Sequence, residues 1–285
     1  MRARVTALAA LTALGLAPSA FAAGASFGLR PVTATAAVPA SQSYFVLTGR
    51  PGQTISQKVR ISNSGTGAGT VALYPVDATT GQTSGTVFQS STAPKRSVGA
   101  WITLSARRLT LAPGASRVVS FVVRVPRTVR PGQYVGGITA ENLAVQSSTD
   151  QSGGGALRIK IRSLAIDAVQ INVPGAMASR MQIGDVKAGG ANSYQQLFVG
   201  LRNAGAVMLK PKLSMSVYAS NGQRRLKSSA QLDTFLPASQ IGYPVLVRGK
   251  ALGPGSYQAL VTLSYGHGLV VKGRLTGPRS SVHRG

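Results

Sequence analysis

A two-residue alternation of apolar and polar side chains, repeated along most of the chain, constrains the fold more than any other feature of this sequence. In the run Val119–Val125, every second residue is Val or Phe, and Val59–Ile61 and Val261–Tyr265 are shorter runs of the same kind. No stretch repeats apolar residues at the spacings of three and four that an amphipathic helix needs. Turns rich in Gly and Pro, such as Pro113-Gly114, separate the runs. Many short strands at even spacing predict an all-β protein made of immunoglobulin-like β-sandwiches.

The strand-rich runs fall into two consecutive groups, at residues 40–145 and 157–277. Each group has the length of one immunoglobulin-like sandwich. Residues 146–156 between them are polar and rich in Gly and Ser, which predicts a linker. We expect residues 23–39 to form a loose N-terminal arm and residues 278–285 to form a polar tail.

Two short motifs occur once in each half of the chain. An Asn-x-Gly step follows an early strand at Asn63-Ser64-Gly65 and again at Asn203-Ala204-Gly205. A Pro-Gly-x-Tyr step opens a late strand at Pro131–Tyr134 and at Pro254–Tyr257. The repetition indicates two related domains, each with a tight Gly turn and a Tyr packed near a corner of the sandwich.

Residues 1–22 have the three parts of a secretory signal peptide. Arg2 and Arg4 precede a short apolar run, and Ala20-Phe21-Ala22 is a small-residue cleavage site. The apolar run has about a dozen residues, fewer than the ~20 that a transmembrane helix needs. The sequence therefore predicts an exported protein, secreted or associated with the cell wall, whose mature chain has no transmembrane segment.

The composition favours binding to anions over catalysis. The chain has 31 Lys and Arg, six Asp and Glu, two His and no Cys, with a formal net charge of +25. So few acids and imidazoles, scattered among separate strands and loops, predict no enzyme, no metal site and no cofactor. Asp77 is interpreted as a turn residue at the end of a strand. The positive charge indicates a polyanion or an anionic surface as the partner.

An ordered series of motifs in residues 40–142 is similar to the N-terminal domain of the WxL-interacting proteins, a family of Gram-positive cell-surface proteins. The series comprises Tyr44-Phe45, Pro51-Gly52, Val59–Ser62, Asn63-Ser64-Gly65, Leu73–Asp77, Trp101-Ile102, Leu109–Gly114, Val118–Pro126 and Pro131–Ile138. The second half resembles the immunoglobulin-like domain that follows in this family, through Phe235–Pro237, Tyr243-Pro244 and Leu252–Tyr257.

The resemblance implies a non-enzymatic surface protein. Its first domain would bind peptidoglycan, and its second would bind host or surface proteins. Members of the family usually end in a transmembrane helix with a short basic tail, and nothing after Tyr265 can supply one. This difference leaves open whether a WxL-type partner exists and how the protein is held at the surface.

Two sets of residues are candidates for contacts with a wall ligand. Trp101, the only tryptophan, is either a core residue beneath the sheet or a platform for a sugar ring. Six arginines also cluster in the sequence, and guanidinium groups bind carboxylates and phosphates in a bidentate manner. A hairpin across Pro113-Gly114 would bring some of them together, although an ordinary solvated face is the simpler interpretation. The six are Arg107, Arg108, Arg117, Arg124, Arg127 and Arg130.

A candidate for a protein partner lies at the expected start of the second domain. Arg158, Lys160 and Arg162 alternate with Ile159 and Ile161, as in an edge strand with one basic face. This pattern suits either a solvated face or a strand that accepts an acidic partner strand. The alternative function is therefore a chaperone-like module that binds a partner β-strand at a sandwich edge. Export and the lack of interleaved aromatic residues argue against a specific nucleic-acid partner.

Overall fold

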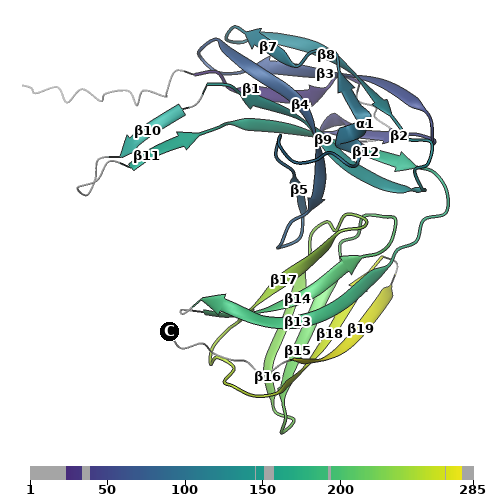
Figure 1. Cartoon of the computed structure of the whole chain (residues 1–285), viewed down its shortest axis with the longest axis vertical. Coiled ribbons are helices and arrows are strands. Elements are labelled where there is room, and N and C mark those ends of the chain that lie inside the picture. The colour runs from purple at the N-terminus through teal and green to yellow at the C-terminus, as the bar shows by residue number, and fades with distance from the viewer. Residues whose placement is uncertain are drawn as a thin grey trace, which may run out of the picture.

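The computed structural model describes residues 24–33, 39–144, 146–150, 157–191, 194–266 and 268–277. These residues form two β-sandwiches, joined at one side and set at an open angle (Figure 1). Apart from strands, they contain one 3-10 turn, Pro39–Gln42, and one short helix, α1, Val98–Trp101. The prediction of an all-β fold made of two immunoglobulin-like sandwiches is confirmed.

The first sandwich consists of two sheets. Sheet 1a has the strand order β1-β3-β8-β6, and sheet 1b has the order β2-β12-β9-β4-β5, with β7 also paired to β4. The strands of sheet 1a are β1 (Phe27–Pro31), β3 (Thr54–Asn63), β8 (Ser116–Arg124) and β6 (Ile102–Leu104). Those of sheet 1b are β2 (Phe45–Thr48), β12 (Leu164–Val173), β9 (Gly132–Asn142), β4 (Gly69–Thr80), β5 (Thr86–Phe88) and β7 (Arg108–Leu111).

The core of the first sandwich follows from the alternation in the sequence. Val59 and Ile61 of β3 pack with Val119 and Phe121 of β8, and all four are almost fully buried. The ring of Phe121 meets the ring of Phe45 from sheet 1b edge to face, with 4.9 Å between centroids. Because every second residue faces this core, the residues between them form the outer face of sheet 1a.

The second sandwich is built in the same way. Sheet 2a has the order β16-β15-β18-β19, and sheet 2b has the order β13-β14-β17. A separate core, with Phe235, Leu213, Met215 and Leu263 at its centre, lies between them. The strands are β13 (Met181–Ala191), β14 (Tyr194–Asn203), β15 (Lys212–Ala219), β16 (Arg224–Gln231), β17 (Gln240–Val247), β18 (Tyr257–Tyr265) and β19 (Leu269–Gly277).

The predicted domain boundaries need two corrections. Residues 27–31, expected in a loose arm, form β1 and pair with β3 along their whole length. Residues 164–173, expected in the second sandwich, form β12 and pair with β9 and β2 of the first. Val169, Ile171 and Val173 of β12 are buried in the first core, and this burial places the strand there.

The expected linker lies between two strands of a hairpin. Residues 146–150 form β10, Gln146–Asp150, which pairs antiparallel with β11, Leu157–Ile161. The predicted signal peptide, residues 1–22, the core of the linker, residues 151–156, and the tail, residues 278–285, lie outside the described residues. No helix among the described residues has the length and apolar character needed to cross a membrane.

The repeated motifs adopt the same local structure in both sandwiches. The Asn63 side chain accepts the N–H of Gly65 and donates to the carbonyl of Gly67, and Asn203 bonds Gly205 and Val207 in the same way. The hydroxyl of Tyr134 donates to the carbonyl of Arg130, four residues earlier. Tyr257 does the same with Gly253. Each Tyr thus closes a tyrosine corner, as in other immunoglobulin-like sandwiches.

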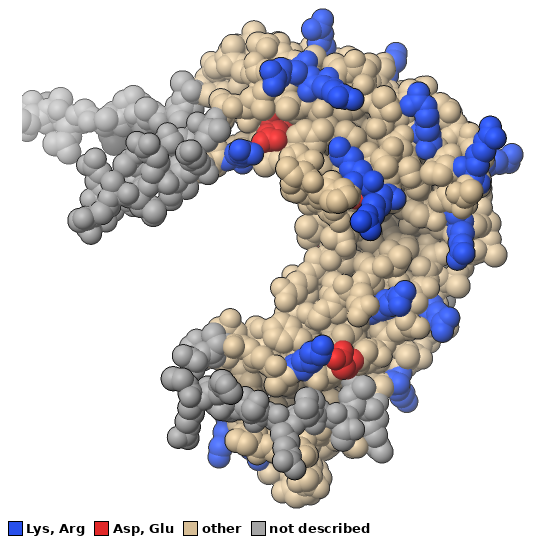
Figure 2. All heavy atoms as spheres, viewed as in Figure 1, with Lys and Arg blue, Asp and Glu red and all other residues tan. Residues whose placement is uncertain are grey.

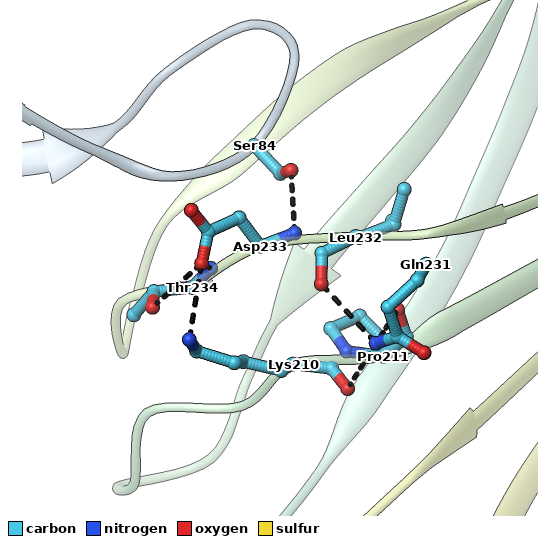
Figure 3. A network of polar contacts seen from close by, with 7 residues as sticks. All are labelled: Ser84, Lys210, Pro211, Gln231, Leu232, Asp233 and Thr234. Atoms are coloured by element: carbon cyan, nitrogen blue, oxygen red, sulfur yellow. Dashed lines mark hydrogen bonds and ion pairs between the residues drawn. The ribbon is translucent and has the colours of Figure 1, made fainter.

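Polar contacts join the two sandwiches next to the chain connection. The hydroxyls of Thr80 and Ser239 lie 2.6 Å apart and are buried. Thr80 also accepts the N–H of Leu236 at 2.9 Å. In Figure 3 the Asp233 N–H donates to the Ser84 hydroxyl, which the turn before β5 carries across the junction. These contacts connect the two sandwiches on the side where the chain passes from one to the other.

Candidate functional site

A buried carboxylate holds the loop that precedes Trp101. Asp77 accepts the backbone N–H groups of Arg96 at 2.5 Å, Ser97 at 2.9 Å and Gly99 at 2.7 Å. Three hydrogen bonds from consecutive parts of the loop to one buried side chain fix this loop on sheet 1b. The interpretation of Asp77 as a strand-end turn residue was wrong, because Asp77 lies inside β4 and anchors a distant loop.

Trp101 packs inward from the end of α1. Its indole lies against the first core and against the ring of Tyr134, with 5.1 Å between centroids and 54° between planes. Burial raises the pKa of Tyr134 above its ordinary value. The partly buried position favours the core interpretation of Trp101 over the sugar platform.

The six arginines of the sequence cluster do not form one site. Arg108 begins β7, which pairs with β4 in sheet 1b, whereas Arg117 and Arg124 lie in β8 of sheet 1a. The hairpin expected across Pro113-Gly114 is therefore absent. Its two flanking strands, β7 and β8, enter different sheets of the sandwich. Arg127 and Arg130 follow β8 in an exposed loop, and Arg107 is exposed just before β7.

The outer face of sheet 1a gathers cations that the sequence places far apart. Arg60 lies opposite Arg30 on one side, and Lys58 lies opposite Ser120 on the other. Arg124, on the same face of β8, donates to the hydroxyl of Thr103 on β6 at 3.1 Å. We call this surface face 1a; its basic residues are Arg30, Lys58, Arg60 and Arg124, and its hydroxyl residues are Thr54, Ser56, Ser62, Thr103, Ser116 and Ser120.

Face 1a has no carboxylate of its own. None of the four strands of sheet 1a contains Asp or Glu, so its cations have no ion-pair partner within the sheet. Figure 2 shows Lys and Arg side chains spread over both sandwiches, with Asp and Glu at few places on the side in view. Of the cluster predicted from the sequence, only Arg124 belongs to face 1a. Arg30 was missed because its strand was taken for a loose arm.

A different feature lies at the edge of sheet 1b. β2 pairs with β12 only at residues 169–172, so residues 164–168 form a half-edge that pairs with β9 alone among the described residues, although β1 lies close by. Leu164 is 52% exposed and Ile166 is 39% exposed on the outer side of this half-edge. On its inner side Asp167 is 3% exposed, and neither of its carboxylate oxygens has a hydrogen-bond partner within the described part of the chain. Burial raises the pKa of Asp167 to about 7.

The predicted partner strand lies next to this half-edge. Arg158 and Lys160 are in β11, which belongs to the hairpin with β10 and is not the first strand of the second sandwich. Arg162 follows β11, and its guanidinium lies 3.4 Å from Glu141, which also accepts the hydroxyl of Tyr74 at 2.9 Å. Burial and this bond to Glu141 raise the pKa of Tyr74 to about 12.

A groove of about 550 Å³ lies between the sandwiches. Its walls come from the outer side of sheet 1b, including Phe88 and Ala168, and from Met208 and Lys210 of the second sandwich. The Lys210 ammonium lies 3.3 Å from Asp233, whose pKa is lowered first by the N–H of Thr234 and then by this lysine (Figure 3). The cation nearest the groove is thus already paired.

The described acids do not converge on a catalytic or metal-binding centre. Among the described residues, no three His, Cys, Asp or Glu side chains lie close enough together to hold a metal ion. Asp77 accepts hydrogen bonds from the loop before Trp101, Asp185 pairs with Lys187 at 3.2 Å, and Asp233 pairs with Lys210. What the geometry offers is surfaces for contact with other molecules.

The fold and these surfaces define a protein of two immunoglobulin-like sandwiches with a cationic sheet face. Residues 27–142 match the family model of the WxL Interacting Protein, peptidoglycan binding domain. The predicted resemblance to the WxL-interacting proteins is therefore confirmed for this part of the chain, which runs from β1 to the end of β9. No curated protein matches the chain.

Solved structures similar to the chain include fimbrial chaperones. The class 5 fimbriae chaperone CfaA has 14% sequence identity and a TM-score of 0.38, over 80% of this chain and 94% of that one. The complex of the SafA pilin with the SafB chaperone from Salmonella enterica gives 9% and 0.36, over 88% and 95%. At such low values the likeness says nothing about function.

Proposed function

We propose that the protein is an exported, non-enzymatic binding protein of the cell wall. Its first sandwich binds peptidoglycan, or an anionic polymer attached to it, through face 1a. The observation that carries the proposal is that the segment matching a peptidoglycan-binding domain holds a sheet face with four cations, six hydroxyl residues and no acid.

The chemistry of face 1a suits a wall polymer. Same-face residues lie ~5 Å apart across strands and ~7 Å apart along them. Neighbouring cations of face 1a are therefore close enough together to contact one extended polymer chain. Guanidinium groups form two parallel hydrogen bonds to a carboxylate, the charged group of peptidoglycan stem peptides. Serine and threonine hydroxyls donate to or accept from sugar and peptide groups between the charges.

The test is binding to purified sacculi whose attached anionic polymers have been removed. The triple variant Lys58→Ser, Arg60→Ser, Arg124→Ser should bind roughly tenfold more weakly, the middle of the range for three exposed ion pairs. The control Arg50→Ser, Lys95→Ser, Arg96→Ser loses the same charge from exposed positions off the face and outside the arginine cluster of the sequence. Equal weakening of both variants would mean that only net charge matters, and face 1a would not be the site.

The salt dependence of this binding separates charge contacts from sugar stacking. Binding through face 1a should weaken steeply as salt rises, because counterions are released when a polyanion binds. Binding that stays constant between low and high salt would count against face 1a. Trp101→Ala would then be the variant to test, with folding checked in parallel.

The alternative function, a strand-binding module, is supported by a different observation, the half-edge of β12 that pairs with β9 alone among the described residues. An unpaired stretch of backbone with exposed apolar side chains suits an added strand from a surface protein. In this second candidate function, Leu164 and Ile166 contact the partner, and the neighbouring Arg158, Lys160 and Arg162 favour an acidic one.

Co-purification from the producing cell tests the second candidate. Leu164→Ser with Ile166→Ser should abolish recovery of a partner that the wild-type chain retains. Leu246→Ser with Val270→Ser is the matched control, because both side chains are exposed but lie in the second sandwich. Recovery of the same partner at the same yield by the β12 variant would exclude the half-edge as the site.

A further inference from the structure

The second sandwich repeats the surface chemistry of face 1a on an unrelated stretch of sequence. Sheet 2a, like sheet 1a, contains no Asp or Glu in any of its strands. The described acids of this sandwich lie in sheet 2b, at Asp185, and in the loop at Asp233. One sheet of each sandwich is therefore free of acids, and in both cases it carries most of the strand cations.

The strand register places hydroxyl groups at the centre of the outer face of sheet 2a. Ser229, Ser214 and Thr262 lie side by side on β16, β15 and β18, and Lys272 of β19 continues the row. Across-strand neighbours on one face are ~5 Å apart, so this row has three hydroxyls and one ammonium at nearly even spacing.

Lysines surround the row of hydroxyls. Lys227 lies opposite Ser216 on the same face, and Lys212 lies opposite Ser264. Lys212, Lys227 and Lys272 are exposed, and none has an ion-pair or hydrogen-bond partner among the residues that the structure describes. We call this surface face 2a; it consists of Lys212, Lys227, Lys272, Arg224, Ser214, Ser216, Ser229, Thr262 and Ser264.

The two faces differ in the kind of cation. Face 1a has three arginines and one lysine, whereas face 2a has three lysines and Arg224, with Arg274 at a further outward register position of β19 opposite Leu260. Arginine makes planar, bidentate contacts to carboxylates and to phosphates, while lysine is a compact point charge whose three rotating donors suit the tetrahedral oxygens of a phosphate. Hydroxyl donors beside a lysine complete the contacts to the two free oxygens of a phosphodiester.

We infer that face 2a is a second binding site, on the second sandwich, for a phosphodiester polymer. This site goes beyond the proposed function, since it lies on the second sandwich, outside the segment that matches the peptidoglycan-binding domain. Together the two faces let one chain hold two components of a wall. Because both sites are on one chain, whose sandwiches are joined by contacts such as that between Thr80 and Ser239, binding at one site raises the effective concentration for the other.

The probe is poly(glycerol phosphate), titrated into the mature full-length chain. The variant Lys212→Ser, Lys227→Ser, Lys272→Ser should bind it roughly tenfold more weakly, with a smaller slope of log affinity against log salt. A second variant with Gln at the same three positions keeps longer side chains and should behave alike. The charge-matched control is Arg180→Ser, Arg248→Ser, Lys250→Ser, exposed in the same sandwich but off sheet 2a.

The controls separate this inference from the proposed function. Equal weakening by the face 2a variant and its control overturns the site. Equal weakening on poly(glycerol phosphate) and on polyglutamate, a carboxylate polymer, overturns the assignment to phosphodiesters. On sacculi stripped of attached polymers the face 2a variant should bind like the wild type. Failure of face 1a in its own test leaves this result untouched.

Discussion

The carboxylate of Asp167 makes the stability of the first sandwich depend on pH in an unusual direction. It is buried on the inner side of β12, has no hydrogen-bond partner among the residues that the structure describes, and burial raises its pKa to about 7. Asp167→Asn keeps the shape of the side chain and removes its titration. Any pH dependence that the wild type has and this variant lacks therefore comes from Asp167.

The sign and size follow from the pKa in the two states. An ordinary Asp in the unfolded chain titrates near pH 3.9, so between about pH 4 and pH 7 the folded state holds more protons than the unfolded state. Stability then falls as pH rises. At ~1.4 kcal/mol for each pKa unit, the full cost reaches an upper limit of ~4 kcal/mol above pH 7. From pH 5 to pH 8, the wild type should lose ~2.5 kcal/mol relative to Asp167→Asn.

The only tryptophan provides the assay. Trp101 packs against the first core, so its fluorescence reports unfolding of the first sandwich without interference from the second. Urea unfolding at pH 5, 6, 7 and 8 gives the free energy of unfolding of both proteins. Asp185→Asn, an exposed position in the second sandwich, is the control and should follow the wild type.

The test compares how the free energy of unfolding of the wild type and of Asp167→Asn changes with pH. If wild type and Asp167→Asn change in parallel from pH 5 to pH 8, Asp167 titrates at an ordinary pKa in the folded protein. The reasoning from burial to destabilisation would then be refuted, whatever constant offset the Asn side chain adds.

Three further substitutions test the packing. Asp77→Ala removes three hydrogen bonds from the loop before Trp101 and should cost about 3 kcal/mol of stability, with a red shift of Trp101 emission in the native state. Asn63→Ala should cost about 3 kcal/mol in the same urea assay, because it leaves buried backbone groups unpaired. Gly205→Ala pushes a methyl group into the carbonyl oxygen of Ala178, so thermal unfolding of the second sandwich should occur several degrees lower.

The class of fold could be predicted because the burial of every second residue in a sandwich produces an alternation of apolar and polar residues in the sequence. Val119, Phe121 and Val123 face the core, and their alternation with polar residues is visible without a structure. The repeated Asn-x-Gly and Pro-Gly-x-Tyr steps were also informative, since each closes hydrogen bonds within a few residues. Features decided by local contacts were within reach of the sequence.

Features that depend on pairing between residues far apart in the sequence could not be predicted. β12 follows a polar, glycine-rich segment, and nothing in its own residues says that it returns to pair with β9 of the first sandwich. The prediction that the arginine cluster forms one site failed for the same reason, because sequence neighbours such as Arg108 and Arg117 enter different sheets. Arg30 and Arg60 are thirty residues apart and lie side by side only through strand register.

Acid-free sheets have a consequence for the protein in the absence of its ligand. In the folded state, β-sheet register holds Arg30 next to Arg60, whereas the unfolded chain lets such charges move apart. Folding therefore works against electrostatic repulsion, and dissolved salt weakens that repulsion by screening. The free protein should gain thermal stability in the same salt range in which it leaves the wall. A bound polyanion would act as a concentrated counterion, so the folded state would be more stable on the wall than in dilute solution.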